Sequence, residues 1–231
     1  MEFFTKYDRF TKTGSGAQPE RLNRRYIALM ENNNHIIQNS TILDIASHDG
    51  RWSFAAIKNG AKQVIGIEGR QELVDKATQN MMHYDIEPNK YCFITGDIHQ
   101  EIHNIKQQID VVLLLGFFYH TMKHYELFEA IKNIAPTYII LDSNVVNTSP
   151  DTPPLIYIKK EPTSNPLYAI GGGEFALVGV PNKAAINTML DDIGYTFQYF
   201  DWQKIPMGMG IAHCQDYKDG NRITLTASLK E

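Results

Sequence analysis

The chain has 231 residues, of which 43% are hydrophobic and 21% are charged. This length suits one α/β domain with a sizeable core, and the composition is that of an ordinary globular protein. The formal net charge of −4 lacks the basic excess that is typical of phosphate-binding chains, so nucleic acid is the less favoured partner.

Hydropathy and cysteine content bear on where the protein works. The longest apolar runs, such as 111–118, are too short to span a membrane, and the first residues are too polar for a secretory signal. Cys92 and Cys214 fit neither a disulfide framework nor a zinc site. Cys92 stands in an apolar run and is expected to be a buried thiol. We therefore expect a cytoplasmic protein with no membrane partner.

The first 40 residues are expected to form an amino-terminal arm and a helix, ahead of a domain at 41–231. Residues 1–19 are polar and contain Gly14-Ser15-Gly16, which suggests a loose arm, and 21–33 has the apolar spacing of a helix. From residue 41, apolar and amphipathic segments alternate. The predicted strands are 41–46, 63–68, 91–95, 110–115 and 137–141, and the predicted helices between them are 51–58, 71–84, 98–105 and 122–133.

These strands carry apolar side chains on both faces, as expected when helices cover both sides of a parallel sheet. Strict alternation gives right-handed crossovers and a doubly wound sheet. A helix at 183–193, capped by Asn182, and two final strands at 195–202 and 222–229 complete the pattern. The sequence thus predicts a Rossmann-like α/β fold with seven strands.

The region 143–181 interrupts this alternation. It is rich in proline and contains Gly171-Gly172-Gly173, and its best strand is 155–160. Long structured loops on such sheets often cover the ligand site, so we interpret it as a lid-like insertion. The alternative is a solvent loop without a role.

The strand ends carry the chemistry, because an open parallel sheet binds its ligand at the carboxyl ends of its strands. The first strand runs into small residues between Asp44 and Gly50, where the backbone can approach a ligand and the next helix offers free N–H groups. Glu68 ends the second strand, and its carboxylate can accept two hydrogen bonds from a ribose diol. Asp97-Ile98 ends the third, where an acid can bond an adenine amine and an apolar side chain can cover the ring.

In this order, the segment 42–146 resembles the core of class I S-adenosylmethionine-dependent methyltransferases. Asp44 and Gly50 match the acid and the last glycine of the family's first motif, whereas Ala46 and His48 stand where it usually has glycine. The resemblance implies a mostly parallel sheet with a reversed last strand, the cofactor S-adenosylmethionine and the product S-adenosylhomocysteine. It places at the cofactor Asp44, Ala46, Ser47 and Gly50 (methionine end), Glu68 (ribose), Asp97 and Ile98 (adenine), and Leu115 and Gly116 (sulfonium). A nicotinamide enzyme is disfavoured because G-x-G-x-x-G is missing.

The acceptor is expected beyond the fourth strand, because the cofactor would span the first three. Phe117, Tyr119 and Asp142 would border it, and the insertion adds Tyr157, Tyr168 and Phe175, which suit an aromatic or partly apolar small molecule. His120 is the predicted general base. The alternative is a histidine that caps the next helix or bonds backbone.

These patterns predict a methyltransferase that acts on an oxygen or nitrogen of a small acceptor. Tyr119-His120 also resembles transferases that modify the wobble uridine of tRNA with carboxy-S-adenosylmethionine, and the irregular first motif leaves a non-catalytic cofactor-binding protein open. Arg24 or Arg25 could hold a cofactor carboxylate, although such arginines are more often simply exposed. No metal is predicted, since His99 and His103 lack a third ligand. The oligomeric state stays open.

Overall fold

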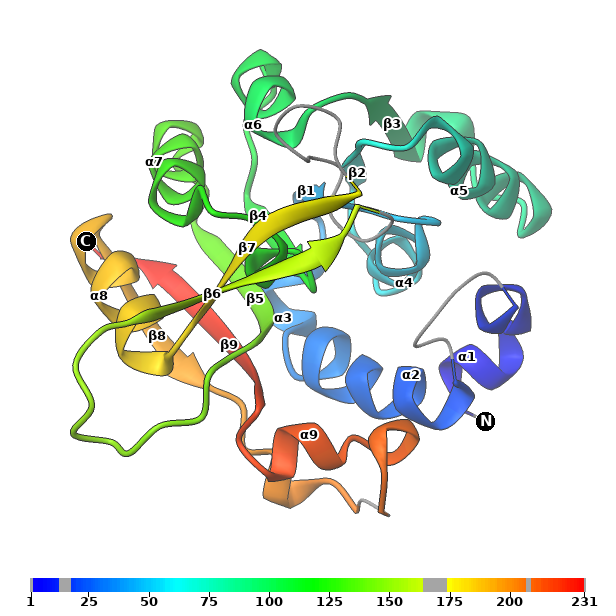
Figure 1. Cartoon of the computed structure of the whole chain (residues 1–231). Coiled ribbons are helices and arrows are strands. Elements are labelled where there is room, and N and C mark those ends of the chain that lie inside the picture. Colours follow the sequence, from blue (N-terminus) through cyan, green and yellow to red (C-terminus); the bar gives the residue numbers. More distant parts are fainter. Residues whose placement is uncertain (1, 13–17, 164–173, 207–208, 231) are drawn as a thin grey trace.

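The structure is a computed structural model that describes residues 2–12, 18–163, 174–206 and 209–230. A seven-stranded sheet with the order β3-β2-β1-β4-β5-β9-β8 lies at its centre (Figure 1). Its parallel strands are β1 (Thr41–Ile45), β2 (Gln63–Glu68), β3 (Tyr91–Thr95), β4 (Val111–Leu115) and β5 (Tyr138–Asn144). β9 (Arg222–Leu229) runs antiparallel to β5 and to the edge strand β8 (Tyr195–Tyr199). This confirms the predicted doubly wound sheet with a reversed last strand.

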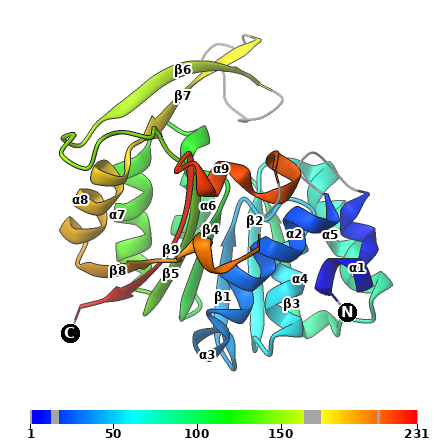
Figure 2. The ribbon, with the colours of Figure 1, turned by 90° about the horizontal axis from the view of Figure 1, so that it is seen from below.

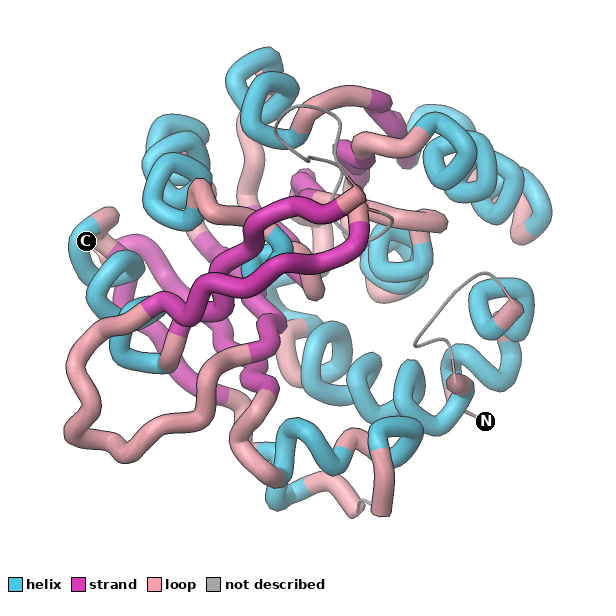
Figure 3. Tube along the Cα trace, in the orientation of Figure 1, coloured by secondary structure: helices cyan, strands magenta, loops and turns pink. Residues whose placement is uncertain are grey.

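Helices cover both faces of the sheet (Figure 3). One face carries α1 (Phe3–Lys6), α2 (Pro19–Tyr26), α3 (Asn34–Ile37), α4 (Arg51–Lys58) and α5 (Gln71–His83); the other carries α6 (Ile98–Glu101), α7 (His124–Ile134) and α8 (Lys183–Asp192). Along β4, Val112 and Leu114 pack on the second face and Leu113 packs on the first. Every residue of β4 is buried, which explains its uninterrupted apolar sequence. None of the described helices is long and apolar enough to cross a membrane.

Several predicted boundaries agree with the structure to the residue, among them β2, β3, β9 and α4. Asn182 caps α8 as expected, since its side chain accepts a hydrogen bond from the Ala185 N–H at 2.9 Å. The helix predicted at 98–105 is shorter, because α6 gives way to a 3₁₀ turn at Ile102–Asn104. The prediction for Cys92 is wrong: β3 forms an edge of the sheet, and this thiol is exposed.

The amino-terminal residues 2–12 pack onto the domain instead of forming a loose arm. Phe4 and Phe10 are fully buried, and their rings lie in a cluster with Phe54 of α4. Arg9 Nε donates to Asn80 Oδ1 of α5 at 2.6 Å. The segment Gly14-Ser15-Gly16 lies outside the described residues. A π-helical turn, η2 (Ile27–Glu31), follows α2 directly.

The insertion forms an antiparallel hairpin of β6 (Ile156–Pro162) and β7 (Phe175–Pro181), which crosses above the carboxyl ends of the parallel strands (Figure 2). Its base is fixed by the Gly179 N–H, which donates to Thr121 O at 3.0 Å. Of the aromatic residues expected to line the acceptor, Tyr157 and Phe175 are more than half exposed, and Tyr168 lies outside the described residues. A minor sheet therefore stands over the end of the main sheet where a ligand is expected.

Candidate functional site

The loop after β1 adopts backbone angles that usually require glycine. Ala46, His48 and Gly50 have φ values of +59°, +52° and +76°. The Ser47 N–H donates to Ile67 O at 3.0 Å, so the loop is tied to β2. A left-handed conformation costs a residue with a side chain about 1–2 kcal/mol. Ala46 and His48, which replace glycines of the motif, therefore adopt the backbone conformation of glycine at an energetic cost.

Asp44 lies beneath this loop and is almost completely buried. Its Oδ2 accepts a hydrogen bond from Ser53 Oγ of α4 at 2.6 Å. Burial raises the pKa of Asp44 to about 7, because desolvation of the carboxylate outweighs the hydrogen bonds from Ser53. Near neutral pH the side chain is therefore partly protonated and would gain charge beside a cationic ligand group.

The raised pKa of Asp44 predicts a pH-dependent stability. The unfolded chain loses this proton near pH 4 and the folded chain only near pH 7, so the contribution of Asp44 to stability should fall as pH rises between these values. Asp44→Asn removes the effect. We expect its gain in unfolding free energy over wild type to be larger at pH 8 than at pH 5 by on the order of 2 kcal/mol.

Urea unfolding of the cofactor-free protein at the two pH values measures this gain. Asp75→Asn, on the exposed side of α5, controls for the loss of a surface carboxylate. An equal effect of Asp44→Asn at both pH values would contradict the buried proton.

Glu68 joins the end of β2 to the first loop. Its Oε2 accepts a hydrogen bond from the His48 N–H at 3.1 Å, and its Oε1 accepts from Arg70 Nε at 2.9 Å and from the Arg70 N–H at 3.2 Å. The side chain is only 3% exposed. A carboxylate offers about four acceptor positions, so Glu68 can still bind a hydroxyl ligand while holding the loop.

The predicted residues of the third and fourth strands lie on either side of this region. Asp97 Oδ1 accepts from the His99 N–H at 2.9 Å and so caps α6, whose first residue, Ile98, is buried. Gly116, after the buried Leu115 of β4, has a φ of +89°. The strands β3, β2, β1 and β4 are neighbours in that order. Their carboxyl ends therefore place in one row Asp97, Glu68, the first loop and Gly116.

The histidines near Asp97 do not gather into a metal site. The His99 ring nitrogen Nε2 lies 3.2 Å from Thr121 Oγ1, and His103 is exposed. Among the described residues, no group of three histidine, cysteine or acidic side chains is arranged to hold a metal ion.

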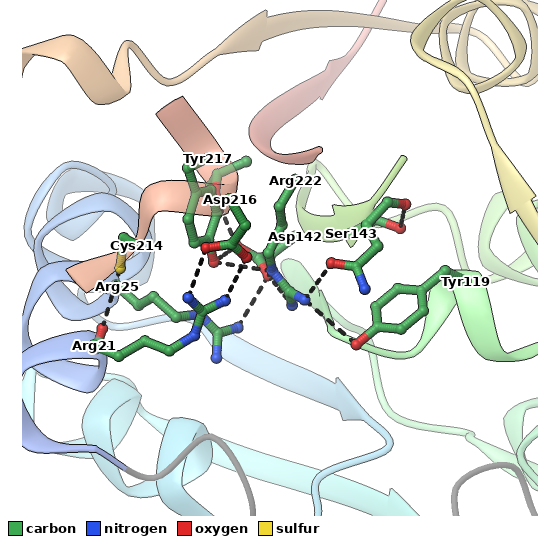
Figure 4. Close-up of polar contacts among 11 residues, drawn as sticks. Arg21, Arg25, Tyr119, Asp142, Ser143, Cys214, Asp216, Tyr217 and Arg222 are labelled. Atoms are coloured by element: carbon green, nitrogen blue, oxygen red, sulfur yellow. Dashed lines mark hydrogen bonds and ion pairs between the residues drawn. The ribbon is translucent and has the colours of Figure 1, made fainter. Parts of the chain in front are cut away.

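Asp142, at the end of β5, is the centre of a buried polar cluster (Figure 4). Its Oδ1 accepts from Arg25 at 3.0 Å and from Arg222 Nε at 2.8 Å, and a second nitrogen of Arg222 also contacts Oδ1. Its Oδ2 accepts from Tyr217 and Thr224, both at 2.8 Å. Burial alone would raise the pKa of Asp142, but Arg222 and Arg25 hold it well below its ordinary value. Expected at the acceptor, this carboxylate is instead enclosed by protein groups.

Two guanidinium groups share this one carboxylate, so the contacting groups carry an excess positive charge. Arg222 also donates to Asn144 Oδ1 at 2.9 Å and to the Tyr119 hydroxyl at 3.3 Å. The Nε of Arg25 is buried without a hydrogen-bond partner, while its guanidinium lies over the ring of Trp52 at 5.0 Å. An orphaned donor on a buried cation is costly and suits an anionic ligand group.

The two arginines that precede β1 therefore differ. Arg24 points to the carboxyl-terminal segment, where its Nε donates to Pro206 O at 3.1 Å. Only Arg25 lies at the strand ends. The sequence identified the pair but could not separate its members.

His120 ends the 3₁₀ turn η5 (Phe118–His120) that follows Gly116. Its Nδ1 lies 2.7 Å from Oε2 of Glu161 in β6, so this ring nitrogen pairs with a side chain and not with backbone, and the residue that precedes α7 as its N-cap is Lys123. Burial lowers the pKa of His120, although Glu161 opposes this shift. The ring of Tyr119 lies 4.1 Å away, and Phe117 is partly buried against the core. Sequence analysis did not identify Glu161. The only indication in the sequence was an acidic residue directly after the predicted strand 155–160.

Comparisons with known proteins place this geometry in context. Residues 42–137 match the model of a methyltransferase domain. No curated protein sequence matches the chain at a significant level.

Solved structures resemble the chain in fold at low sequence identity. The N-terminal domain of EvdMO1 with S-adenosylhomocysteine bound is 15% identical, with a TM-score of 0.63 over 87% of this chain and 79% of that one. Magnesium protoporphyrin IX methyltransferase from Synechocystis PCC 6803, also with S-adenosylhomocysteine, is 16% identical, with a TM-score of 0.62 over 98% and 95%. A putative RNA methyltransferase from Pyrococcus horikoshii is 14% identical, with a TM-score of 0.54 over 90% and 86%.

Proposed function

We propose that the chain, which contains a methyltransferase domain at 42–137 and shares the fold of S-adenosylmethionine-dependent methyltransferases, transfers a methyl group from S-adenosylmethionine to an oxygen or nitrogen of a small-molecule acceptor. One observation carries the choice of chemistry. His120, a partly buried imidazole, stands four residues after Gly116 in the turn that follows β4, and its Nδ1 is held by Glu161. An acceptor that must lose a proton needs such a base beside it.

The residues at the strand ends fit the cofactor. Its ribose diol would bind the Glu68 carboxylate, and its carboxylate would satisfy the orphaned Nε of Arg25. Its ammonium group would lie near Asp44, which gains charge most easily beside a cation. We keep the assignment of the first loop (Ala46, Ser47 and Gly50), of Asp97 and Ile98 at the adenine, and of Leu115 and Gly116 beside the sulfonium. Ser47 Oγ, buried without a partner, adds a polar group that a ligand can use.

The cofactor supplies a methyl group on a sulfonium, whose sulfur keeps the bonding electron pair when the acceptor's electron pair takes the methyl group. The protein's own part is to position and to accept a proton. Phe117 and Tyr119 would border the acceptor, and His120 Nε2 would take its proton. We withdraw Asp142 from the acceptor site and assign it to holding Arg25 and Arg222, since its oxygens are already bonded.

Glu68→Ala tests the cofactor site. We expect the wild type to bind S-adenosylhomocysteine with micromolar affinity, about −8 kcal/mol. The variant should lose about 1–3 kcal/mol of binding free energy, because the ribose hydroxyls lose their acceptor and the loop loses the hydrogen bond from the His48 N–H to Glu68. Isothermal calorimetry measures both values, with Glu72→Ala on the exposed first turn of α5 as the matched control. Absence of binding to the wild type, or tighter binding of NAD, would overturn the cofactor assignment.

Salt dependence separates a small acceptor from tRNA. Counterion release makes specific tRNA binding fall steeply between about 50 and 200 mM salt. We expect only weak tRNA binding in filter assays at either salt concentration, in keeping with the net charge of −4. Tight, salt-sensitive binding would favour the tRNA-modifying alternative. Methyl transfer from labelled cofactor to a panel of acceptors tests the non-catalytic alternative, which predicts none.

We also propose a role for each of three segments of the chain. Residues 41–231 would form the methyltransferase domain, with the insertion 143–181 as a lid above the acceptor. Residues 1–40 would close the cofactor side through Arg25. The cysteine content supports a cytoplasmic location, since neither thiol has a disulfide partner.

A further inference from the structure

We propose that Glu161 is a positioning residue for His120, delivered by the hairpin to hold the imidazole with Nε2 free for the acceptor. This inference rests on the proposed role of His120 as general base. It gives the insertion a chemical part in the site, in addition to covering it.

The first support is the side on which Glu161 lies. In the β6–β7 register, Glu161 pairs with Ala176 and Lys159 pairs with Val178, so these side chains share one face of the hairpin. The side chain of Glu161 is 12% exposed and that of His120 is 19% exposed. Ile158 and Leu177, which are both 54% exposed, belong to the opposite face. The face with Glu161 is therefore the one turned to the end of β4.

The second support is the anchoring of the hairpin beside His120. Gly179 of β7 donates its N–H to Thr121 O, and its own carbonyl accepts from His124 Nε2 at 2.9 Å. The fit is close, because a Cβ on Gly179 would lie 2.6 Å from His124 Cε1 and 2.6 Å from Ile156 Cγ2. The hairpin is thus fixed to the residues that follow His120 in the chain, which sets the place of Glu161.

The third support is the arrangement of charges around the imidazole. Glu161 and Lys159 face it from β6, Arg222 from β9, and the ring of Tyr119 from its own turn. Lys159 Nζ lies 2.7 Å from Glu161 Oε1. Burial acts to raise the pKa of Glu161, but Lys159 and His120 bring it below its ordinary value, so the carboxylate stays ionised.

An ionised carboxylate can only accept, so Nδ1 of a neutral His120 must carry the proton and Nε2 the lone pair. The proton that the acceptor loses moves to Nε2. The imidazolium that forms is paired with Glu161 until the proton leaves to water. An imidazole oriented and paired by a carboxylate is a recurrent design for general bases.

Nitrogen and carbon NMR of the His120 ring in the full-length protein tests the pairing without an acceptor. In the wild type we expect the tautomer with hydrogen on Nδ1. Glu161→Gln keeps the shape and removes the charge, so the pKa of His120 should fall by about one unit. Lys159→Met is the matched control, because loss of this cation should move the same pKa upward. Unchanged signals from the other histidines would show that both variants fold.

Kinetics supply the second readout. In Glu161→Gln the acidic limb of the turnover profile should move to lower pH by the same amount, with the affinity for S-adenosylhomocysteine unchanged. A His120 pKa that stays within about 0.2 units in Glu161→Gln, or hydrogen on Nε2 in the wild type, would overturn the pairing. Full methyl transfer by His120→Ala would overturn the base role and with it the purpose given to Glu161, so the two failures are distinct.

Discussion

His120→Ala is expected to lower turnover by about 10²–10⁴-fold while the affinity for S-adenosylhomocysteine stays nearly unchanged. His120 lies beyond Gly116 on the proposed acceptor side, whereas the groups assigned to the cofactor are at the ends of β1 to β4, up to Gly116, and include Arg25. Loss of the imidazole therefore removes the proton acceptor and leaves the cofactor contacts in place. Steady-state methyl transfer and calorimetry measure the two quantities separately.

The control for this variant is His103→Ala, which removes an exposed histidine on the turn after α6. It should leave turnover and cofactor affinity unchanged. If His120→Ala retains full turnover, His120 is not the base. If it loses turnover and cofactor affinity together, the side chain acts in shaping the site.

The central sheet was predictable because helices cover both of its faces, which requires apolar residues along the whole of its inner strands. β4 and β2 are buried almost throughout, so their apolar runs mark them without ambiguity. The edge strand β3 has a similarly apolar sequence but is only partly buried, so Cys92 was wrongly predicted to be buried. Apolar runs predict a strand but not its place in the sheet.

The loop after β1 could be located although two glycines of the family's motif are absent from it. The signals that remained were an acid at the end of β1, a small residue and a final glycine, and they lie at one turn. The left-handed backbone at Ala46 and His48 could not be inferred from these residue types, which rarely adopt it. The loop shape is imposed by its surroundings, including the hydrogen bonds from Ser47 to Ile67 and from His48 to Glu68.

Pairs of charged side chains from distant segments were beyond prediction. Arg25 and Asp142 are 117 residues apart, Arg222 and Asp142 are 80 apart, and His120 and Glu161 are 41 apart. Helix α2 brings Arg25, the reversed strand β9 brings Arg222, and the β6–β7 hairpin brings Glu161 to the strand ends. Sequence analysis named Arg25, Asp142 and His120 separately and did not name Arg222 or Glu161, and the pairing itself follows only from the packing of these segments.

Asp142→Ala is expected to destabilise the protein by about 3–5 kcal/mol, the usual cost of leaving a buried ionic partner unpaired. The carboxylate joins three parts of the chain: Arg25 of α2, Arg222 of β9, and Tyr217 of α9 (Gln215–Lys218). Since Asp142 is fully buried, solvent and salt screen these contacts little. Urea unfolding at low and high ionic strength should give nearly the same loss.

Asp142→Asn sharpens the test, because it keeps the size of the side chain and an oxygen acceptor while removing the charge. The unfolding free energy of Asp142→Asn should lie between that of the wild type and that of Asp142→Ala. Asp216→Asn provides a comparison in the same region, where the Arg21–Asp216 pair is more exposed on its acidic side and should contribute less. A loss below about 1 kcal/mol for Asp142→Ala would mean that water or a neighbouring acid compensates the two arginines. In that case the positive charge of Arg25 would already be compensated, and its unpaired Nε would no longer support an anionic ligand at the proposed cofactor site.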